Sequence, residues 1–485
     1  MGGNYERGLY NQFIEVMERL DTVEKESKKE IKRLNDEISD LKKENQHLKE
    51  ENRLLRDDNA RMKSILNNDS SNTSQPPSTD QKGGKPANTY NSREKTSRKA
   101  GGQKGHNGTT LTRAEVEEKI RSGKCLHQIK TVGDPAGKSY VTKYVIDLDI
   151  KPVITEIRIY ADEQGHYAIP REYRSDVVYG TNVKAMAVAL YSEGVMSNDR
   201  IAAFLNAVSG DGLNLSEGSV YYFCKYFSQI SESSIAHLEE ELLSEPVVAT
   251  DATVITVNGK QEYIRNFSTT KSVLYRAMKD KKLDTIHRVH FIEKYTGILM
   301  HDHETALYHF GTDHGECNVH VIWYLRKNTE ETQNTWSSQM IKLLCEMNQM
   351  RKTAIKEKET GFETAVLLGY EKKYDELIVL GRAENKKTKH RYAKDEEKKL
   401  WNRMEKYKRN HLLFMHDFRM PFDNNMSERD LRKAKNRQKM SGGFRKVSGY
   451  EMYCRIVTII ETLKRRKMGI LENIKLLFIG TPAIF

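Results

Sequence analysis

The sequence predicts a multidomain protein of mixed α/β class. Three observations lead to this prediction: an apolar heptad repeat over residues 31–66, a helix-forming segment over residues 182–243, and a series of strand-like stretches that begins at Glu245. The chain has 485 residues, of which 37% are hydrophobic. It is therefore long enough for several domains and at least one sizeable core.

The charge balance favours a polyanionic partner, because 80 Lys and Arg residues face 68 acids and the pI is near 9.1. The five cysteines lie far apart with no Cys-x-x-Cys, a pattern that indicates neither a disulfide framework nor a four-cysteine zinc site. The N-terminus lacks an apolar signal core, and no run approaches the roughly 18 apolar residues that span a bilayer. We expect a soluble cytoplasmic protein.

The heptad repeat predicts a parallel two-stranded coiled coil. One core position holds Ile31, Ile38, Asn45, Asn52, Asn59 and Leu66, and the other holds Leu34, Leu41, Leu48, Leu55 and Met62. Leucine at one position and recurring asparagine at the other favour two strands in fixed register, because each buried amide needs its mate opposite. The alternative is a single solvated helix, which five consistent heptads make less favoured.

A polar, Pro- and Gly-containing segment at residues 67–92 predicts a flexible linker. The basic stretch that follows, residues 93–111, alternates glycines with charged side chains, among them Arg98, Lys99, Lys104 and His106. We expect these four to contact a DNA backbone or minor groove. An extended basic tail has the same composition, so this alternative stays open.

The middle of the chain changes from strand to helix patterns. Residues 139–160 alternate with period two and are rich in β-branched side chains, which predicts a small β-hairpin domain. Residues 182–243 predict helices, with a turn and N-cap over residues 212–220. Two helices around this turn are compatible with a helix-turn-helix or with ordinary helix packing.

From Glu245 the pattern predicts four strands, and two acids occupy them. Asp251 lies within PVVATDATVITV, and Asp302 follows the apolar stretch of TGILMHD. A carboxylate in a buried strand costs several kcal/mol unless a cation or hydrogen bonds compensate it. Both acids are therefore candidate functional residues.

A third acid, Glu428, lies in a strongly basic segment. Residues 429–446 contain eight Lys or Arg residues against one acid, Asp430. Asp423 or Asn424 is expected to cap a helix that carries Glu428 in its early turns. The alternative is an ion pair between Glu428 and Arg432 on a solvated helix.

Together the three acids form the ligand set that two divalent ions need. Carboxylate oxygens suit Mg²⁺ or Mn²⁺, and two ions about 4 Å apart can activate an attacking oxygen and stabilise a leaving one in phosphodiester chemistry. Each acid taken singly is equally compatible with an ordinary surface position.

The order and spacing of several motifs resemble the transposases of the insertion sequence 66 family, a DDE-type group of bacterial mobile elements. Besides the zipper, the motifs are SRKAGGQKGHNGTTL (97–111), YGTNVKAMAVALYSEGVMSNDRIAAFL (179–205), LSEGSV (215–220), ATDATVITVNG (249–259), GILMHDH (297–303), CNVH (317–320) and PFDNNMSERDLRKAKNRQKMSGGF (421–444). The resemblance implies catalytic roles for Asp251, Asp302 and Glu428 on a ribonuclease H-like α/β core. The long interval between the last two acids then implies an insertion, which helix-forming residues place at about 313–411.

The chain also departs from the family pattern. The zinc-binding region of the family is represented only by Cys125 and His127, so we expect no zinc. Ala252 stands where the family commonly has glutamate. Cys317 and His320 match a Cys-x-x-His of the family, but two ligands do not complete a tetrahedral site. A structural role or contact with the cleaved strand is expected for this pair.

The leading hypothesis is a dimeric transposase that binds the terminal inverted repeats of its element and uses two Mg²⁺ or Mn²⁺ ions for DNA cleavage and transfer into target DNA. Arg429, Arg432, Lys433, Lys435 and Arg437 are expected to bind phosphates. Accessory proteins encoded by the element are possible further partners. The resemblance implies association with the nucleoid when the protein is bound to DNA, and we expect no association with a membrane. Two alternatives are a noncatalytic DNA-binding repressor or bridging protein derived from a transposase, and a coiled-coil scaffold, which leaves the acidic strands unexplained.

The expected domains follow in chain order. They are a coiled coil (1–66), the linker (67–92), the basic motif with a small β domain (93–178), a helical region (179–243), the catalytic domain with its insertion (244–440) and a C-terminal helical region (441–485).

Overall fold

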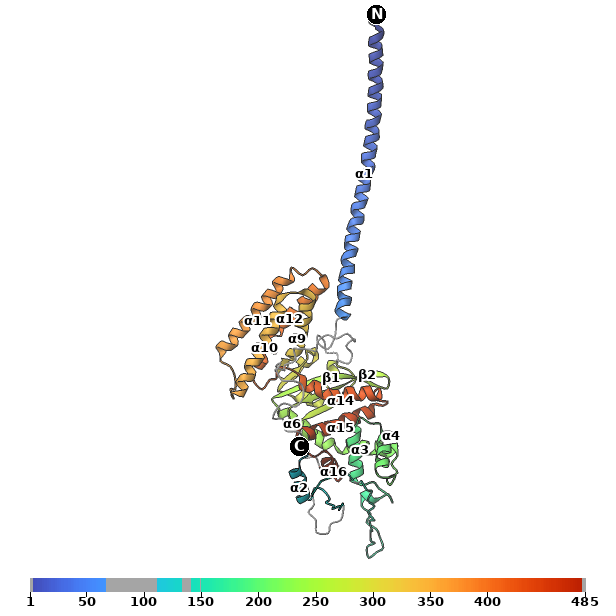
Figure 1. Ribbon diagram of the computed structural model, residues 1–485, viewed down its shortest axis with the longest axis vertical. Helices are drawn as coiled ribbons and strands as arrows, with labels where there is room; N and C mark the ends of the chain where they lie inside the picture. The colour runs from blue at the N-terminus through green and yellow to red at the C-terminus, as the bar shows by residue number, and fades with distance from the viewer. Residues whose placement is uncertain (1–2, 67–110, 133–140, 149, 482–485) are drawn as a thin grey trace. The chain divides into compact units, whose positions relative to one another are not determined.

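The computed structural model describes residues 3–66, 111–132, 141–148 and 150–481 (Figure 1). The expected linker and the four basic residues Arg98, Lys99, Lys104 and His106 lie outside these ranges. The chain divides into two compact units, one containing residues 1–85 and 318–418 and the other containing residues 86–317 and 419–485.

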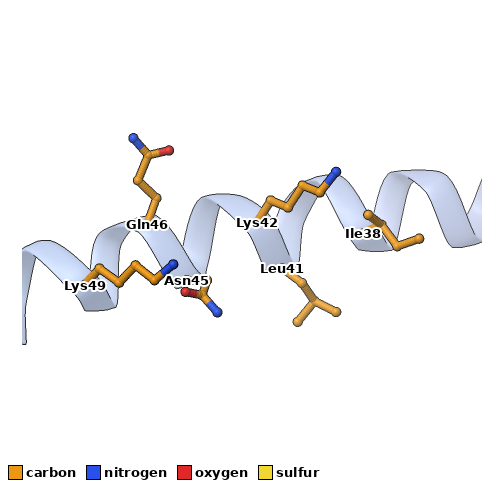
Figure 2. Close-up of a pocket in the computed structure, with 6 residues that line it drawn as sticks. All are labelled: Ile38, Leu41, Lys42, Asn45, Gln46 and Lys49. Carbon is orange, nitrogen blue, oxygen red and sulfur yellow. The ribbon is translucent and has the colours of Figure 1, made fainter.

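In the first unit the N-terminal region is one continuous helix, α1 (Gly3–Leu66). Its heptad core positions face solvent in the single chain: Leu34 is 45% exposed, Ile38 48% and Leu41 57%. Figure 2 shows Leu41 and Asn45 projecting from one side of α1 and Gln46 from the opposite side. The helix predicted over residues 31–66 is confirmed, whereas its pairing with a second copy stays a prediction.

The rest of the first unit is a helical bundle. It comprises α9 (Asn318–Thr332), α10 (Thr335–Lys356), α11 (Thr364–Asn385), α12 (Arg391–Lys406) and α13 (Lys408–His416). Glu397 on α12 is fully buried and accepts hydrogen bonds from Trp336 Nε1 (2.7 Å) and Asn385 Nδ2 (2.9 Å), which ties three helices together. The insertion is helical as predicted, but it begins after residue 317 because residues 313–316 form a strand that the sequence analysis missed.

The second unit is built on a five-stranded sheet of order β3-β2-β1-β4-β5. The strands are β1 (Val247–Val257), β2 (Lys260–Ser268), β3 (Val273–Met278), β4 (Ile298–His301) and β5 (Asp313–Glu316). The first three strands pair antiparallel, whereas β4 is parallel to β1 and β5 is parallel to β4. A tight turn explains the first pairing, because Asn258 and Gly259 both adopt the positive φ that a two-residue hairpin requires.

Helices that precede the strands, lie between them or follow them in the chain complete this unit. They are α2 (Arg113–Arg121), α3 (Thr181–Glu193), α4 (Asn198–Val208), α5 (Glu217–Ile230), α6 (Glu232–Ser244), the short α7 (Leu283–Ile286) and α8 (His290–Lys294), then α14 (Asn425–Ser441), α15 (Val447–Arg465) and α16 (Ile470–Phe478), with single-turn helices η2 (Arg171–Tyr173) and η3 (Thr305–His309). The predicted N-cap at the start of α5 is present: Ser216 Oγ accepts from Ser219 N at 3.1 Å.

One buried core joins the helices to the sheet. It includes Val188 of α3, Phe227 of α5, Phe267 of β2 and Ile460 of α15. Helix α14 packs on β1 and β2, and α15 packs on β3. Figure 1 shows α14 beside the labelled strands β1 and β2. The boundaries expected at residues 243 and 440 therefore do not separate independent cores, because helices before and after the sheet share its apolar interior.

The predicted β-hairpin domain at 139–160 is absent from the described part of that span, which contains no strand. Its apolar side chains remain in solvent: Val145 is 91% exposed and Ile154 96%. Alternation stabilises a strand only where a partner strand and a packed face are present, and the described residues supply neither here. Among the described residues, no helix is both long and apolar enough to cross a membrane.

Candidate active site

Register brings two of the three predicted acids, and a cysteine, into one row. Across the parallel strands, Ala249 of β1 pairs with Met300 of β4, and Met300 pairs with Gly315 of β5. Two residues farther along each chain are Asp251, Asp302 and Cys317. Neighbouring strands lie about 4.8 Å apart and side chains alternate between faces, so this common offset places the three side chains side by side on one face.

The third acid, Glu428, reaches this row from the first turn of α14. The Met420 side chain lies over Gly315, where an added Cβ would be only 2.0 Å from the Met420 Cε atom, so a larger residue at 315 would require the end of the Met420 side chain to move. Helix α14 begins at Asn425, and Glu428 lies in its first turn. Ligand atoms of Asp302, Cys317 and Glu428 all lie within 4.8 Å of one another.

Asn424 fixes the start of α14 against the strands. It is the N-cap residue, as predicted, but its side chain makes no capping hydrogen bond. Its Nδ2 instead donates to the Thr250 carbonyl (3.0 Å) and to Asp302 Oδ1 (3.3 Å), and its backbone N–H donates to Cys317 Sγ (3.3 Å). Asp423 supplies an oxygen to the helix start, accepting from Asn425 N at 3.1 Å. One asparagine thus links three chain segments of the site.

A second buried asparagine, Asn266 on β2, holds the other side of the site. Its Oδ1 accepts from Asp251 N (3.1 Å) and Ser427 Oγ (2.6 Å), and its Nδ2 donates to Ser268 Oγ (3.1 Å) and the Ser427 carbonyl (2.9 Å). The side chain is fully buried, and all of its hydrogen-bonding capacity is used. The Asn266 side chain therefore links the Asp251 backbone in β1 to Ser427 in α14 and fixes the distance between them.

The electrostatics of the row favour a bound cation. Burial, reinforced by the negative charge of Asp302, raises the pKa of Asp251 from 3.8 to about 6. Two neighbouring carboxylates repel each other, and a divalent ion between them would reverse that penalty. Asp251, Asp302 and Glu428 are each partly exposed, so ions have access to all three.

Histidines support the strand ends behind the acids. His301 Nε2 lies 3.2 Å from His314 Nδ1, and burial, followed by the neighbouring His314, lowers the pKa of His301 to about 3. The buried Glu316 lies 2.7 Å from His303 Nδ1 and also bonds Tyr308. These neutral or paired groups immobilise the residues on either side of Asp302.

The residues present fit a divalent cation. Carboxylate oxygens of Asp302 and Glu428 lie within 4.8 Å of each other, and the register places Asp251 on the strand next to Asp302. The Oδ1 atom of Asn424, a residue only 1% exposed, has no hydrogen-bond partner among the described residues. A buried oxygen without a partner requires an ion, a water or a ligand to satisfy it. Asp251, Asp302 and Glu428 would hold the ions.

Helical periodicity sorts the predicted DNA-binding residues of α14. Arg432 and Lys435 follow Glu428 by four and seven residues, so they share its face, and both are exposed, as is Arg429. Lys433 instead pairs with Glu193 of α3 and Glu461 of α15. Arg437 is 9% exposed, with its guanidinium 4.7 Å from the Tyr191 ring centre and donating to the Met196 carbonyl. These last two cations are engaged within the protein, so of the five predicted phosphate-binding residues only Arg429, Arg432 and Lys435 are exposed.

The sequence pattern pointed to the three acids but not to the residues that hydrogen-bond around them. Asn424 was expected only to cap a helix, Asn266 carried no signal, and Cys317 was expected to have a structural role or to contact the cleaved strand. Its motif partner His320 begins the helical bundle in α9, where its ring centre lies 4.4 Å from that of Trp323. Cys125 and His127 lie exposed outside any helix or strand.

The chain matches the family model described as Transposase IS66 family over residues 177–452, more than half its length. This range contains the whole sheet, the three acids and α14. No curated protein shows a significant match. The extent of the family match establishes that this chain belongs to the IS66 transposase family.

Proposed function

We propose that the protein is an active DNA transposase whose Asp251, Asp302 and Glu428 hold two Mg²⁺ or Mn²⁺ ions for cleavage and transfer of DNA strands at the ends of its element. The observation that carries the proposal is the convergence of Asp302 and Glu428, far apart in sequence, within 4.8 Å, beside Asp251 on the adjacent strand.

The strand order supports a ribonuclease H-like core. Three antiparallel strands followed by two parallel strands, in the order β3-β2-β1-β4-β5, place Asp251 on the central strand and Asp302 at the end of its parallel neighbour. The carboxyl ends of parallel strands are where open α/β sheets bind ligands. The helix that carries Glu428 then closes the site from one face.

The reaction needs an activated oxygen nucleophile and a stabilised leaving oxygen, which bound divalent ions supply. The protein's own part is to hold the three carboxylates in place. Asn424 and Asn266 restrain the strands and α14, so that the ligands are arranged before DNA binds. No protein nucleophile is required, because water and then a DNA 3′-hydroxyl attack phosphorus.

DNA is expected to lie along the face of α14 that begins with Glu428. Replacing both Arg432 and Lys435 with alanine should weaken binding to any DNA sequence and reduce the slope of log K against log salt by about 2, because two phosphate contacts are lost. Fluorescence anisotropy at several salt concentrations measures this slope. Lys294→Ala, an exposed cation on α8, is the control. An unchanged slope in the double variant would remove DNA from this face.

We also propose that α1 pairs with a second copy through its exposed apolar side. The same heptad register holds Tyr10, Phe13, Met17 and Leu20 nearer the N-terminus, beyond one heptad whose core positions are the polar Glu24 and Ser27. The four apolar side chains are all exposed in the single chain. In a single solvated helix the apolar side chains at the heptad core positions stay exposed and add no stability. A two-stranded coiled coil buries these side chains against the partner helix.

Light scattering on the full chain should give twice the 56.1 kDa chain mass. Lysine at both Leu41 and Leu48 should shift the mass toward the monomer, because it places charges opposite each other in the seam. Gln46→Lys, on the opposite side of α1, should leave the dimer intact (Figure 2). Equal masses for all three proteins would place self-association elsewhere.

The function is tested on DNA that contains the two flanks of this reading frame. The purified protein with Mg²⁺ should nick at the element ends and leave a 3′-hydroxyl, EDTA should stop the reaction, and renewed Mg²⁺ should restore it. Binding of the same DNA without any cleavage in Mg²⁺ or Mn²⁺ would instead identify a noncatalytic repressor or bridging protein.

A further inference from the structure

We propose that the thiol of Cys317 is a direct ligand of the ion held by Asp302 and Glu428, which makes this half of the site a mixed sulfur and oxygen site. The proposal rests on the proposed function, since it adds a ligand to the metal site of that function. It assigns to this chain a preference for thiophilic divalent ions that three carboxylates alone do not have.

Position is the first argument. Cys317 follows β5 directly and stands next to Asp302 in the parallel register, where its backbone N–H donates to the His301 carbonyl at 3.1 Å. Its Sγ lies within 4.8 Å of ligand oxygens of both Asp302 and Glu428. One ion can contact a sulfur at about 2.3 Å and oxygens at about 2.1 Å, so this separation suits a shared ion.

Burial and polarity are the second argument. Cys317 is 1% exposed, yet its sulfur faces two carboxylates rather than the apolar side chains that surround the buried Cys224. The backbone N–H of Asn424 points at the sulfur, a contact that favours negative charge on it. The unpartnered Oδ1 of the same Asn424 independently indicates a missing cation or water in this corner.

The chemistry of the ligand set gives the expected selectivity. Mg²⁺ prefers six oxygens in a strict octahedron, whereas a thiolate with carboxylates suits Zn²⁺, Cd²⁺ or Co²⁺ and remains acceptable to Mn²⁺. The thiol proton leaves to solvent when the metal–sulfur bond forms, so binding of a thiophilic ion releases one proton from Cys317.

The test uses Cd²⁺, because a cadmium–thiolate bond absorbs in the ultraviolet and reports the ligand directly without any activity assay. The reference protein is the full chain with the exposed Cys125 and Cys345 changed to serine, which removes competing thiols. It should bind Cd²⁺ with a charge-transfer band. Adding Cys317→Ser should remove the band and lower Cd²⁺ affinity at least about 10-fold, since even second-shell partners change metal affinity 10- to 100-fold.

Cys317→Ser is nearly isosteric, and its Oγ can still accept from Asn424 N, so the fold should survive; circular dichroism checks this. Equal Cd²⁺ affinity and no band in either protein would overturn the sulfur ligand while the carboxylate site stands. If neither Cd²⁺, Mn²⁺ nor Mg²⁺ raises the melting temperature of the wild-type chain, the metal site of the proposed function fails together with this proposal.

Discussion

Asp251→Asn should reduce Mg²⁺-dependent strand cleavage by about 10³-fold or more, and it should also make the metal-free protein more stable at neutral pH. Activity falls because the variant removes a negative ligand from the site that stabilises the reacting oxygens. Stability rises because burial and Asp302 already oppose the charge on Asp251. A neutral amide of the same shape relieves that opposition.

The pH dependence follows from the pKa of about 6 for Asp251, against 3.8 in the unfolded chain. Between these values the folded protein keeps a proton that the unfolded chain releases, so wild-type stability falls as pH rises from about 4 to about 6. At pH 7 the wild type should be less stable than Asp251→Asn by on the order of 1–3 kcal/mol, the difference vanishing below pH 4. Urea unfolding in EDTA across this range measures both effects.

Asp284→Asn on the exposed start of α7 is the matched control, and it should change neither cleavage nor the pH profile. Cleavage by Asp251→Asn at the wild-type rate would exclude Asp251 as a ligand. If the stability of Asp251→Asn had the same pH dependence as that of the wild type, the pKa of the Asp251 carboxyl group would not be raised in the folded protein.

Asn266→Ala should produce the largest loss of stability of any single change near the site, about 3 kcal/mol or more. The alanine leaves Asp251 N and the Ser427 carbonyl without their partner and opens a buried gap between β2 and α14. Because Glu428 follows Ser427 directly, the same change should release Glu428 from its position, and Mn²⁺ should then stabilise the variant much less than the wild type. Thermal unfolding with and without Mn²⁺ measures both quantities.

Asn436→Ala is a suitable comparison, because Asn436 is an exposed asparagine of α14. Its effect should stay within about 0.5 kcal/mol, and its response to Mn²⁺ should match the wild type. If Asn266→Ala kept the full Mn²⁺ response, the position of Glu428 would not depend on the asparagine network.

Local patterns were sufficient to predict the elements that carry the acids. Apolar alternation located β1 to β4, and the conspicuous carboxylates at Asp251 and Asp302 followed from the cost of burying charge in a strand. The strand β5 was not predicted because its sequence, DHGE at residues 313–316, shows no apolar alternation. It is a strand because it pairs with β4, a contact that the local sequence does not reveal. The heptads likewise predicted α1, since its spacing is intrinsic to the helix.

The features of the site that the sequence did not predict depend on contacts between residues far apart in the chain. The place of Cys317 beside Asp302 depends on the register of β5 against β4, and the cross-links of Asn424 depend on a segment that returns from far along the chain. The sequence does not distinguish Arg437 from the other basic residues of α14, whereas the structure shows its guanidinium packed on the Tyr191 ring. The alternation at 139–160 shows the converse, because a strand pattern without a partner strand formed no strand in its described residues.

Iron-mediated cleavage of the polypeptide tests most directly whether the three acids share one metal pocket. Fe²⁺ replaces Mg²⁺ at carboxylate sites, and with ascorbate and peroxide it produces radicals that cut the backbone next to the ion. Mass spectrometry of the fragments should locate cuts near Asp251, Asp302 and Glu428 together, all suppressed by excess Mg²⁺ and all lost in Asp302→Asn. Cuts confined to one of the three positions, or unaffected by Mg²⁺, would contradict a common site.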